Sequence, residues 1–354
     1  MSRMSRAGKT GLSLGAAVGV LAAGAAVSLA AERYAVGRSL RKADSRVDGP
    51  WRGESYESIE EIVTSDDGIR LVTDVHGDPQ SEAVVILAHG YALNRFSWWY
   101  QWRDLPAHLG PNFRFVRYDQ RGHGESEFGE IESIDDLAED LFCVIEHHAS
   151  RGEDIYLVGH SMGGMTIQAF AKRFPDIFSE RVRGVTLVSS TPGPLPDSPL
   201  GLPILDIPVI NNFAPQIVDF LASKSELVDR SLKLGKDFGF VLTKRYSFSS
   251  QVDPRLVEFV SEMIRQTPFE TLAYFFPLFG EFNGRPAMKA MSKVPTTILS
   301  GANDRLTPVD HARYMSEKIK GSSYIEAAKT GHLMMLERPD LVTDAIVDLV
   351  RADR

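Results

Sequence analysis

The sequence predicts an α/β protein in which helices flank a mostly parallel sheet. Short apolar runs suited to strands alternate with longer segments of helical pattern along most of its 354 residues. Hydrophobic residues make up 43% of the chain, enough to fill a large core. A third observation is the segment Gly159-His160-Ser161-Met162-Gly163, which stands between an apolar run and a helical stretch. The length suits one α/β core that carries an insertion.

The first elements predicted in the core form a β-hairpin. Residues 59–64 and 69–73 flank an Asp66-Asp67-Gly68 turn. Further on, Ser133-Ile134-Asp135-Asp136 resembles a capping box that opens a helix ending near Ala149. The remaining strands are expected where short apolar runs occur, at 84–88, 113–118, 155–158, 296–301 and 323–326.

The glycine-flanked serine indicates a sharp turn from strand to helix. A Cβ two residues either side of Ser161 would obstruct this turn, which exposes the serine Oγ above the sheet edge. The N–H of Met162 then lies at a helix N-terminus, where it can donate to a developing oxyanion. Because a serine hydroxyl is a poor nucleophile at neutral pH, a base and a group that orients the base are also needed.

Candidates for the base and the acid follow downstream, each on a loop after a predicted strand. Asp304 follows the strand at 296–301, and His332 follows Gly331 after the strand at 323–326. Asp304 is preferred to Asp197 as the acid, and its alternative role is that of a helix-capping or turn aspartate.

The other histidines are expected to be structural. His89 and His123 lie in glycine turns and His160 packs beside the serine, and only one base can bond to its Oγ. Asp119 is expected to order the Arg121-Gly122 turn. Solvated or packed imidazoles are expected at His76, His108, His147, His148 and His311.

Together these motifs resemble the α/β-hydrolase fold over about residues 58–354. The chain order Ser161, Asp304, His332 is that family's order for its catalytic triad. Two family signatures also follow strands, His89-Gly90-Tyr91 and the segment Asp119-Gln120-Arg121-Gly122-His123-Gly124-Glu125-Ser126. The resemblance implies that the N–H of Tyr91 is the second oxyanion donor beside that of Met162.

The serine motif is also similar to those of particular hydrolases. His160-Ser161-Met162-Gly163-Gly164 resembles monoacylglycerol lipases, simple carboxylesterases and cofactor-free haloperoxidase-like esterases, and the pattern recurs in meta-cleavage C–C hydrolases. Family members that open epoxides or remove halide use aspartate as nucleophile, so Ser161 disfavours both chemistries.

The α/β rhythm breaks between residues 192 and 291. Six prolines between Pro192 and Pro208 precede long, apolar segments of helical pattern. We expect a helical cap here, inserted after the sixth strand, because insertions at this point of the fold cover the active site. The hydrolase core is therefore expected to comprise residues 47–191 and 292–354.

Residues 1–46 are expected to be a membrane anchor followed by a basic linker. Residues 11–31 carry no charge and are long enough to span a bilayer. The alternatives are a cleaved secretory signal and a helix that packs on the protein or lies at its surface. Five basic residues follow this segment and three precede it, which favours a cytoplasmic catalytic domain without deciding the membrane side. Gly11, Gly15 and Gly19 would share one helix face and permit self-association, although such spacing also arises by chance in Ala/Gly-rich segments.

Charge and cysteine content exclude several classes of partner. Residues 1–46 hold 8 of the 39 Lys and Arg and 2 of the 47 Asp and Glu, so the remainder has a formal charge of about −14. That acidity opposes nucleic-acid binding. Cys143 is the only cysteine, which excludes a disulfide or a cysteine-based zinc cluster within one chain, and no phosphate-binding loop is present. We therefore expect no cofactor and no metal.

The sequence thus predicts a membrane-associated serine hydrolase that cleaves carboxylic esters, of lipidic or other hydrophobic acyl type, through an acyl-enzyme. A C–C bond hydrolase of the meta-cleavage type would use the same triad and is one alternative. The other is a catalytically inactive member of the fold that binds a hydrophobic ligand.

Overall fold

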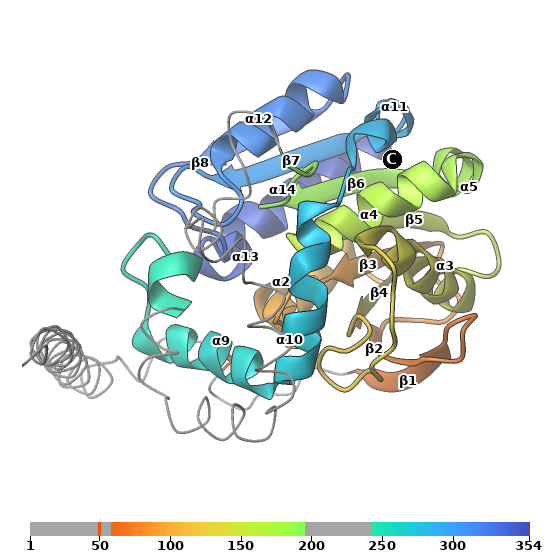
Figure 1. Ribbon diagram of the computed structural model, residues 1–354. Coiled ribbons are helices and arrows are strands. Elements are labelled where there is room, and N and C mark those ends of the chain that lie inside the picture. The colour runs from red at the N-terminus through yellow and green to blue at the C-terminus, as the bar shows by residue number, and fades with distance from the viewer. Residues whose placement is uncertain (1–48, 51–57, 195–242) are drawn as a thin grey trace, which may run out of the picture.

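A computed structural model describes residues 49–50, 58–194 and 243–354 (Figure 1). Its eight-stranded sheet has the order β1-β2-β4-β3-β5-β6-β7-β8, in which β1–β2 and β2–β4 are antiparallel and the other pairs parallel. The strands are β1 (Ile59–Thr64), β2 (Arg70–His76), β3 (Ala83–Ala88), β4 (Phe113–Tyr118), β5 (Asp154–His160), β6 (Val182–Val188), β7 (Thr296–Gly301) and β8 (Ser323–Ala327). The predicted fold class is confirmed.

Helices cover both faces of the sheet. The helices are α2 (Trp99–Leu109), α3 (Leu137–His148), α4 (Met162–Arg173), α5 (Pro175–Arg181), α9 (Pro254–Gln266), α10 (Phe269–Phe275), α11 (Met288–Met291), α12 (Val309–Lys318), α13 (Met334–Glu337) and α14 (Pro339–Asp353). Helices α3, α4, α5, α11 and α12 contribute to one buried cluster, and α2, α9, α13 and α14 contribute to the other.

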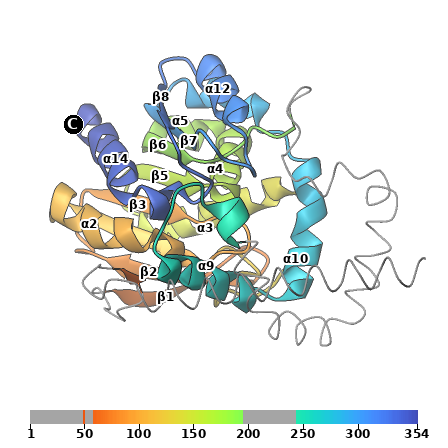
Figure 2. The ribbon, with the colours of Figure 1, turned by 90° about the vertical axis from the view of Figure 1, so that its left-hand side faces the viewer.

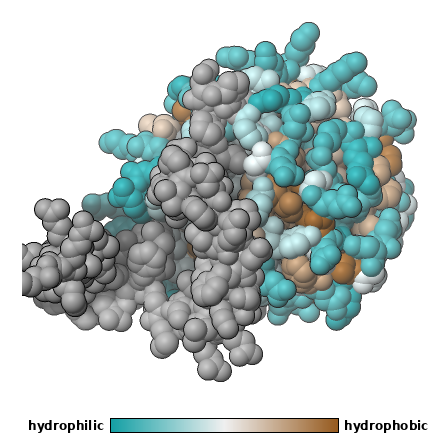
Figure 3. Space-filling view, in the orientation of Figure 1, coloured by the Kyte–Doolittle hydropathy of each residue, from teal (hydrophilic) through white to brown (hydrophobic). Residues whose placement is uncertain are grey.

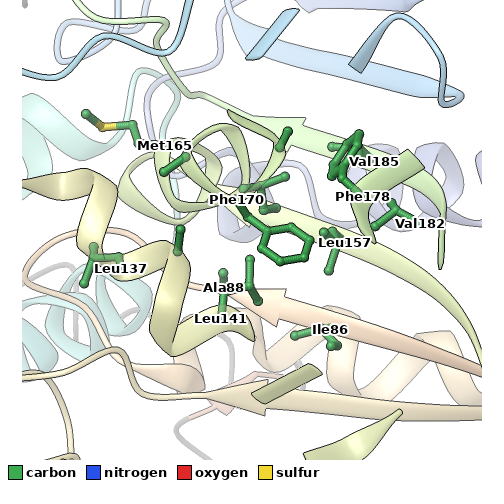
Figure 4. Packing of buried hydrophobic residues seen from close by; sticks show 14 of the residues in the cluster. Ile86, Ala88, Leu137, Leu141, Leu157, Met165, Phe170, Phe178, Val182 and Val185 are labelled. Carbon is green, nitrogen blue, oxygen red and sulfur yellow. The ribbon is translucent and has the colours of Figure 1, made fainter. Parts of the chain in front are cut away.

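The central strands are apolar throughout because both of their faces are buried. In β3, Val84 and Ile86 join the cluster on the α4 side, while Val85 and Leu87 join the opposite cluster. Figure 4 shows Phe170 of α4 packed within the cluster on the α4 side, near Ala88 and Leu157. In contrast, the described surface in the view of Figure 3 is mostly hydrophilic.

The predicted hairpin is confirmed, with β1 and β2 paired from Thr64↔Arg70 to Ile59↔Val75. The capping-box segment also begins a helix, since Asp136 accepts a hydrogen bond from the N–H of Ser133 at 3.0 Å. Its first turn is a 3₁₀ turn, η3 (Ile134–Asp136), which leads into α3.

The predicted cap is described only from residue 243, since residues 195–242 lie outside the described ranges. The described part holds α9, α10, η4 (Phe276–Gly280) and η5 (Arg285–Ala287), all between β6 and β7. Figures 1 and 2 show α9 and α10 at the periphery of the sheet, where α9 contributes to one buried cluster and Phe275 of α10 to the other. Helix α10 contacts the loop after β4, where the hydroxyl of Thr271 donates to the carbonyl of Gly122 at 3.0 Å.

None of the helices in the described ranges is long and apolar enough to cross a bilayer. The predicted anchor at residues 11–31 lies outside these ranges, as does the rest of residues 1–46. The anchor therefore stays a prediction.

Candidate active site

Ser161 lies on a strained turn between β5 and α4. Its φ of 49° and ψ of −112° are sparsely populated by residues other than glycine, and such a conformation costs about 1–3 kcal/mol. A Cβ on Gly163 would lie 2.2 Å from the carbonyl oxygen of Ala88, and one on Gly159 would lie 2.6 Å from the backbone of Gly163. Both glycines are therefore required by close backbone approaches, as the sequence pattern predicts.

The backbone of Ser161 is held by the neighbouring strand β6. Its N–H donates to the carbonyl of Val188 at 3.0 Å, and its carbonyl accepts from the hydroxyl of Ser190 at 2.9 Å. The Ser161 side chain is partly exposed. Met162 is the first residue of α4, where an amide N–H has no acceptor within the helix. The helix dipole further favours negative charge at this end.

Asp304 and His332 form a buried hydrogen-bonded pair. The Nδ1 of His332 lies 2.8 Å from Oδ2 of Asp304, and both residues are less than 10% exposed. The other oxygen of Asp304 accepts the N–H groups of Leu306 at 2.8 Å and Thr307 at 2.9 Å. Asp304 therefore acts as a turn aspartate with one oxygen and contacts His332 with the other. A carboxylate only accepts, so Nδ1 carries the proton and Nε2 is left as the basic nitrogen.

The loops that carry the three candidate residues meet at one edge of the sheet. Ser161 follows β5, Asp304 follows β7 and His332 follows β8, and the carboxyl ends of parallel strands lie at the same edge. The ring centroids of His332 and His160 are 4.8 Å apart, so the candidate base lies beside the residue that precedes Ser161. The carbonyl of His332 also lies 3.1 Å from Nε2 of His160.

The loop after β3 passes directly over the serine turn. A Cβ on Gly90 would lie 2.6 Å from Nδ1 of His160 and 3.2 Å from Cβ of Ser161. Because only glycine leaves this space open, the backbone of Gly90 comes close to the nucleophile. Tyr91 follows Gly90 directly, and its N–H as the second oxyanion donor, the role that the family resemblance implies, stays a prediction.

The other histidines of this region are buried and bonded to the backbone. His89 accepts the N–H of Gln120 at 2.9 Å while its Nδ1 contacts the carbonyl of Gly90 at 2.7 Å. Burial lowers the pKa of His89 to about 4 and that of His123 to about 3, and it holds the pKa of His160 well below its ordinary value. These rings stay neutral near pH 7, in agreement with the structural roles expected of them.

Asp119 orders a different part of its turn from the one expected. Its carboxylate accepts the backbone N–H of Arg95 at 2.7 Å and that of Glu125 at 2.9 Å, and it pairs with the Arg95 guanidinium. The side chain of Arg121 instead bonds to Asp140, with Nε 2.6 Å from Oδ2. The buried Arg95–Asp119 pair joins the loops after β3 and β4, because a buried carboxylate needs a cationic partner.

Two residues that sequence reasoning missed hold the acid and base in position. Thr307 places its hydroxyl 2.8 Å from Oδ2 of Asp304, 3.3 Å from Nδ1 of His332 and 2.9 Å from the carbonyl of Ser189. Glu337 accepts the N–H of Gly331 at 2.7 Å, which anchors the loop that carries His332. The spacings Asp304-x-x-Thr307 and Gly331-x₅-Glu337 are the only signals in the sequence, and both are common.

No group of three potential metal ligands occurs beside the candidate triad in the described part of the chain. The one such group found there lies on β1 and α3 and comprises Glu61, His147 and His148.

Comparisons with known proteins identify the family of the fold. A family model described as the alpha/beta hydrolase fold matches residues 83–339. The AB hydrolase superfamily protein YisY of Bacillus subtilis is 29% identical over 294 residues, 82% of this chain and 97% of that protein. The karrikin insensitive 2 receptor CA of Petunia hybrida is 25% identical over 288 residues, 77% of this chain and 93% of that protein.

A solved structure extends the agreement to the fold. The structure of a thermophilic esterase from Thermogutta terrifontis superposes with a TM-score of 0.63 at 24% identity. The alignment covers 84% of this chain and 99% of the esterase. At this level of identity the similarity concerns the fold alone.

Proposed function

The chain belongs to the α/β-hydrolase fold family, and on that basis we propose that it is a serine hydrolase that cleaves carboxylic esters through an acyl-enzyme. The observation that carries the proposal is the buried Asp304–His332 hydrogen bond of 2.8 Å beside the strained turn of Ser161. The carboxylate fixes the ring so that Nε2 is the nitrogen that receives a proton. A serine on such a turn becomes nucleophilic only with a base of this kind.

In the first half of the proposed reaction, Oγ of Ser161 attacks the ester carbonyl while its proton passes to Nε2 of His332. The N–H groups of Met162 and Tyr91 donate to the resulting oxyanion. When the tetrahedral intermediate collapses, the leaving alcohol takes the proton from Nε2. In the second half, a water molecule gives its proton to Nε2 and attacks the acyl-enzyme, and the proton then returns to Oγ as the acid product leaves.

The proposed substrates are small esters with a hydrophobic acyl group, including lipid esters. Aromatic side chains of the described cap segment support this class, because the ring of Phe279 packs edge-on against that of Tyr91 at 5.0 Å. The hydroxyl of Tyr91 donates to the carbonyl of Leu272 at 2.6 Å, which places α10 against the loop of the proposed oxyanion donor. An acyl chain that entered beside this loop would meet apolar rings.

Hydrolysis of p-nitrophenyl esters of graded chain length tests the proposal. We expect the wild type to turn over these esters and Ser161→Ala to lose measurable turnover. Ser179→Ala is the matched control, since that partly exposed hydroxyl bonds to the carbonyl of Pro175 on α5, away from the triad. Full activity in Ser161→Ala would refute the assignment.

Assays on the same protein preparation distinguish two other functions from ester hydrolysis. Turnover of a dienol-type ring-cleavage product in preference to every ester would favour the C–C hydrolase, which needs the same triad. The similarity to a protein named as a receptor favours hydrophobic-ligand binding as a second candidate. That function would be indicated by saturable binding of a hydrophobic ligand without turnover of any ester.

We further propose that residues 1–46 anchor the enzyme to a membrane. The uncharged segment at 11–31 and the basic residues that flank it support this location. A membrane location would also bring the enzyme near lipidic esters.

A further inference from the structure

Glu61, His147 and His148 lie together at the β1 edge of the sheet, whereas the candidate triad follows β5, β7 and β8. Glu61 belongs to β1, the first edge strand, and the two histidines form the last turn of α3. One ligand atom from each residue lies within 4.8 Å of the others. The hydrolytic reaction proposed above uses none of these three side chains.

The hydrogen-bond network around His148 assigns its ring tautomer. The hydroxyl of Thr73 donates to the carbonyl of Glu61 at 3.2 Å, so it accepts at its second contact, 3.1 Å from Nε2 of His148. Nε2 therefore carries the ring proton, and Nδ1 presents a lone pair 3.8 Å from Oε2 of Glu61. His148 is 1% exposed, so packing and the Thr73 contact fix the position of its ring.

His147 completes the group from the solvent side. Its Nε2 lies 3.1 Å from the same Oε2 of Glu61, and its side chain is 44% exposed. Ligand atoms on one tetrahedral ion with bonds of about 2.0 Å are about 3.3 Å apart. The separations of 3.1 and 3.8 Å to Oε2 are close to that value, and all three ligand atoms lie within 4.8 Å of one another.

We propose that Glu61, His147 and His148 form a binding site for a divalent transition-metal ion such as Zn²⁺. Two imidazole nitrogens and a carboxylate oxygen are ligands that suit zinc, nickel or cobalt better than magnesium or calcium. Thr73 contacts Nε2 of His148, the ring nitrogen that would not bind the ion, and so orients the ring as the hydrogen-bond partners of metal-ligating histidines do. Water fills the remaining coordination positions.

Binding requires one rearrangement of protons. In the metal-free pair, Nε2–H of His147 donates to Glu61, whereas the ion needs the lone pair of that nitrogen. If the His147 ring is neutral, its proton moves to Nδ1 through solvent. If the ring is an imidazolium, it releases one proton when the metal binds. The guanidinium of Arg114 lies near His148 and opposes a cation, so the site requires an ion that forms strong bonds to nitrogen.

The ion would join the edge strand to the helix that covers it. Strand β1 pairs with β2 alone in the described sheet, and the metal would tie its Glu61 to the C-terminal turn of α3. We therefore expect bound metal to raise the temperature of unfolding, because a ligand that binds only the native state stabilises it.

Calorimetric titration of the tag-free, EDTA-treated full-length protein with ZnCl₂ tests the proposal. We expect saturable binding of one Zn²⁺ at micromolar or lower concentration, accompanied by a rise in the melting temperature. His147→Ala and Glu61→Gln are each expected to weaken binding about tenfold or more, and Thr73→Val about 10- to 100-fold. His108→Ala is the matched control, because it removes an exposed histidine of α2 outside the group.

The variants also separate the metal site from a simple ion pair. A Glu61–His147 hydrogen bond without metal function predicts no one-to-one zinc binding and no dependence on Thr73. Absence of saturable binding in the wild type would overturn the proposal. Binding of equal strength in the wild type, His147→Ala and Glu61→Gln would do the same, since the ion would then occupy another place.

Discussion

Replacement of Asp304 by Asn tests how the candidate base is oriented. In the wild type, one carboxylate oxygen accepts the N–H groups of Leu306 and Thr307, and the other accepts Nδ1–H of His332. The amide oxygen of the introduced asparagine must keep the two backbone donors, so its NH₂ group faces the imidazole. This NH₂ group has a second acceptor in the Thr307 hydroxyl, which in turn donates to the carbonyl of Ser189 at 2.9 Å. The substitution therefore fits without strain.

The expected effect follows from the ring tautomer. With an NH₂ group opposite Nδ1, this nitrogen must accept, so the proton moves to Nε2. The imidazole then holds a proton where the nucleophile needs to deliver one. In serine proteases the equivalent loss lowers kcat about 10⁴-fold. This factor corresponds to about 5 kcal/mol of transition-state stabilisation, at about 1.4 kcal/mol per factor of ten.

The assay is steady-state hydrolysis of a p-nitrophenyl ester by the wild type, Asp304→Asn and a matched control. Asp310→Asn is that control, because its exposed carboxylate pairs with Arg313 at 3.2 Å, on the helix that follows the same loop. We expect the control to retain full activity and both variants to keep the wild-type circular dichroism spectrum. A folded Asp304→Asn variant whose kcat lies within tenfold of the wild type would refute the role given to the carboxylate.

Three further predictions concern the serine turn, a buried histidine and the N-terminus. Gly163→Ala places a Cβ 2.2 Å from a β3 carbonyl and should lower the free energy of unfolding, measured by urea denaturation, by about 3 kcal/mol. Gly280→Ala, with open space at its Cβ, should lower it much less. Equal losses in the two variants would contradict the close approach at Gly163. The pKa of His123 is about 3 in the folded protein, against an ordinary value of 6.5. As pH falls below 6.5, the unfolded chain therefore takes up this proton before the folded protein does. By pH 5 the free energy of unfolding is lowered by about 2 kcal/mol. His123→Gln should remove that part of the acid-induced loss, and an unchanged dependence on pH would rule out the neutral buried ring. In cell fractionation, the full chain should stay in the membrane pellet after carbonate washing and residues 47–354 should not; release of both would exclude the anchor.

Much of the fold was predictable because its determinants are local. The Asp66-Asp67-Gly68 turn lies between two short runs suited to strands, and the structure pairs these runs as β1 and β2. The glycines around Ser161 similarly report a turn geometry that few other residues tolerate. The predicted strands in the centre of the sheet are apolar on both faces, a pattern that reflects burial by helices on each side.

Other contacts depend on long-range packing and leave no clear pattern along the chain. Chain order and strand ends predicted that Asp304 and His332 would come close, but the hydroxyl of Thr307 beside both becomes visible only in the folded loop. Nothing in the sequence around Arg95 indicates burial, yet this residue is 2% exposed and paired with Asp119.

The group on β1 and α3 illustrates the same limit. Adjacent histidines at the end of an amphipathic helix are ordinary, and Glu61 is one of two glutamates in an edge strand. Their proximity arises because α3 packs across the hairpin, which brings His147 to Glu61 from 86 residues away in sequence. No spacing rule for metal ligands connects positions so far apart.

The most direct test of the central claim is to map the site of covalent modification by a fluorophosphonate. This reagent requires a serine oxygen activated by a neighbouring base, so labelling reports the nucleophile without assumptions about the natural substrate. We predict one adduct per chain, located by peptide mass spectrometry on Ser161, and much slower labelling of Asp304→Asn. An adduct on another serine such as Ser190, or no adduct on a folded wild-type protein, would contradict the account.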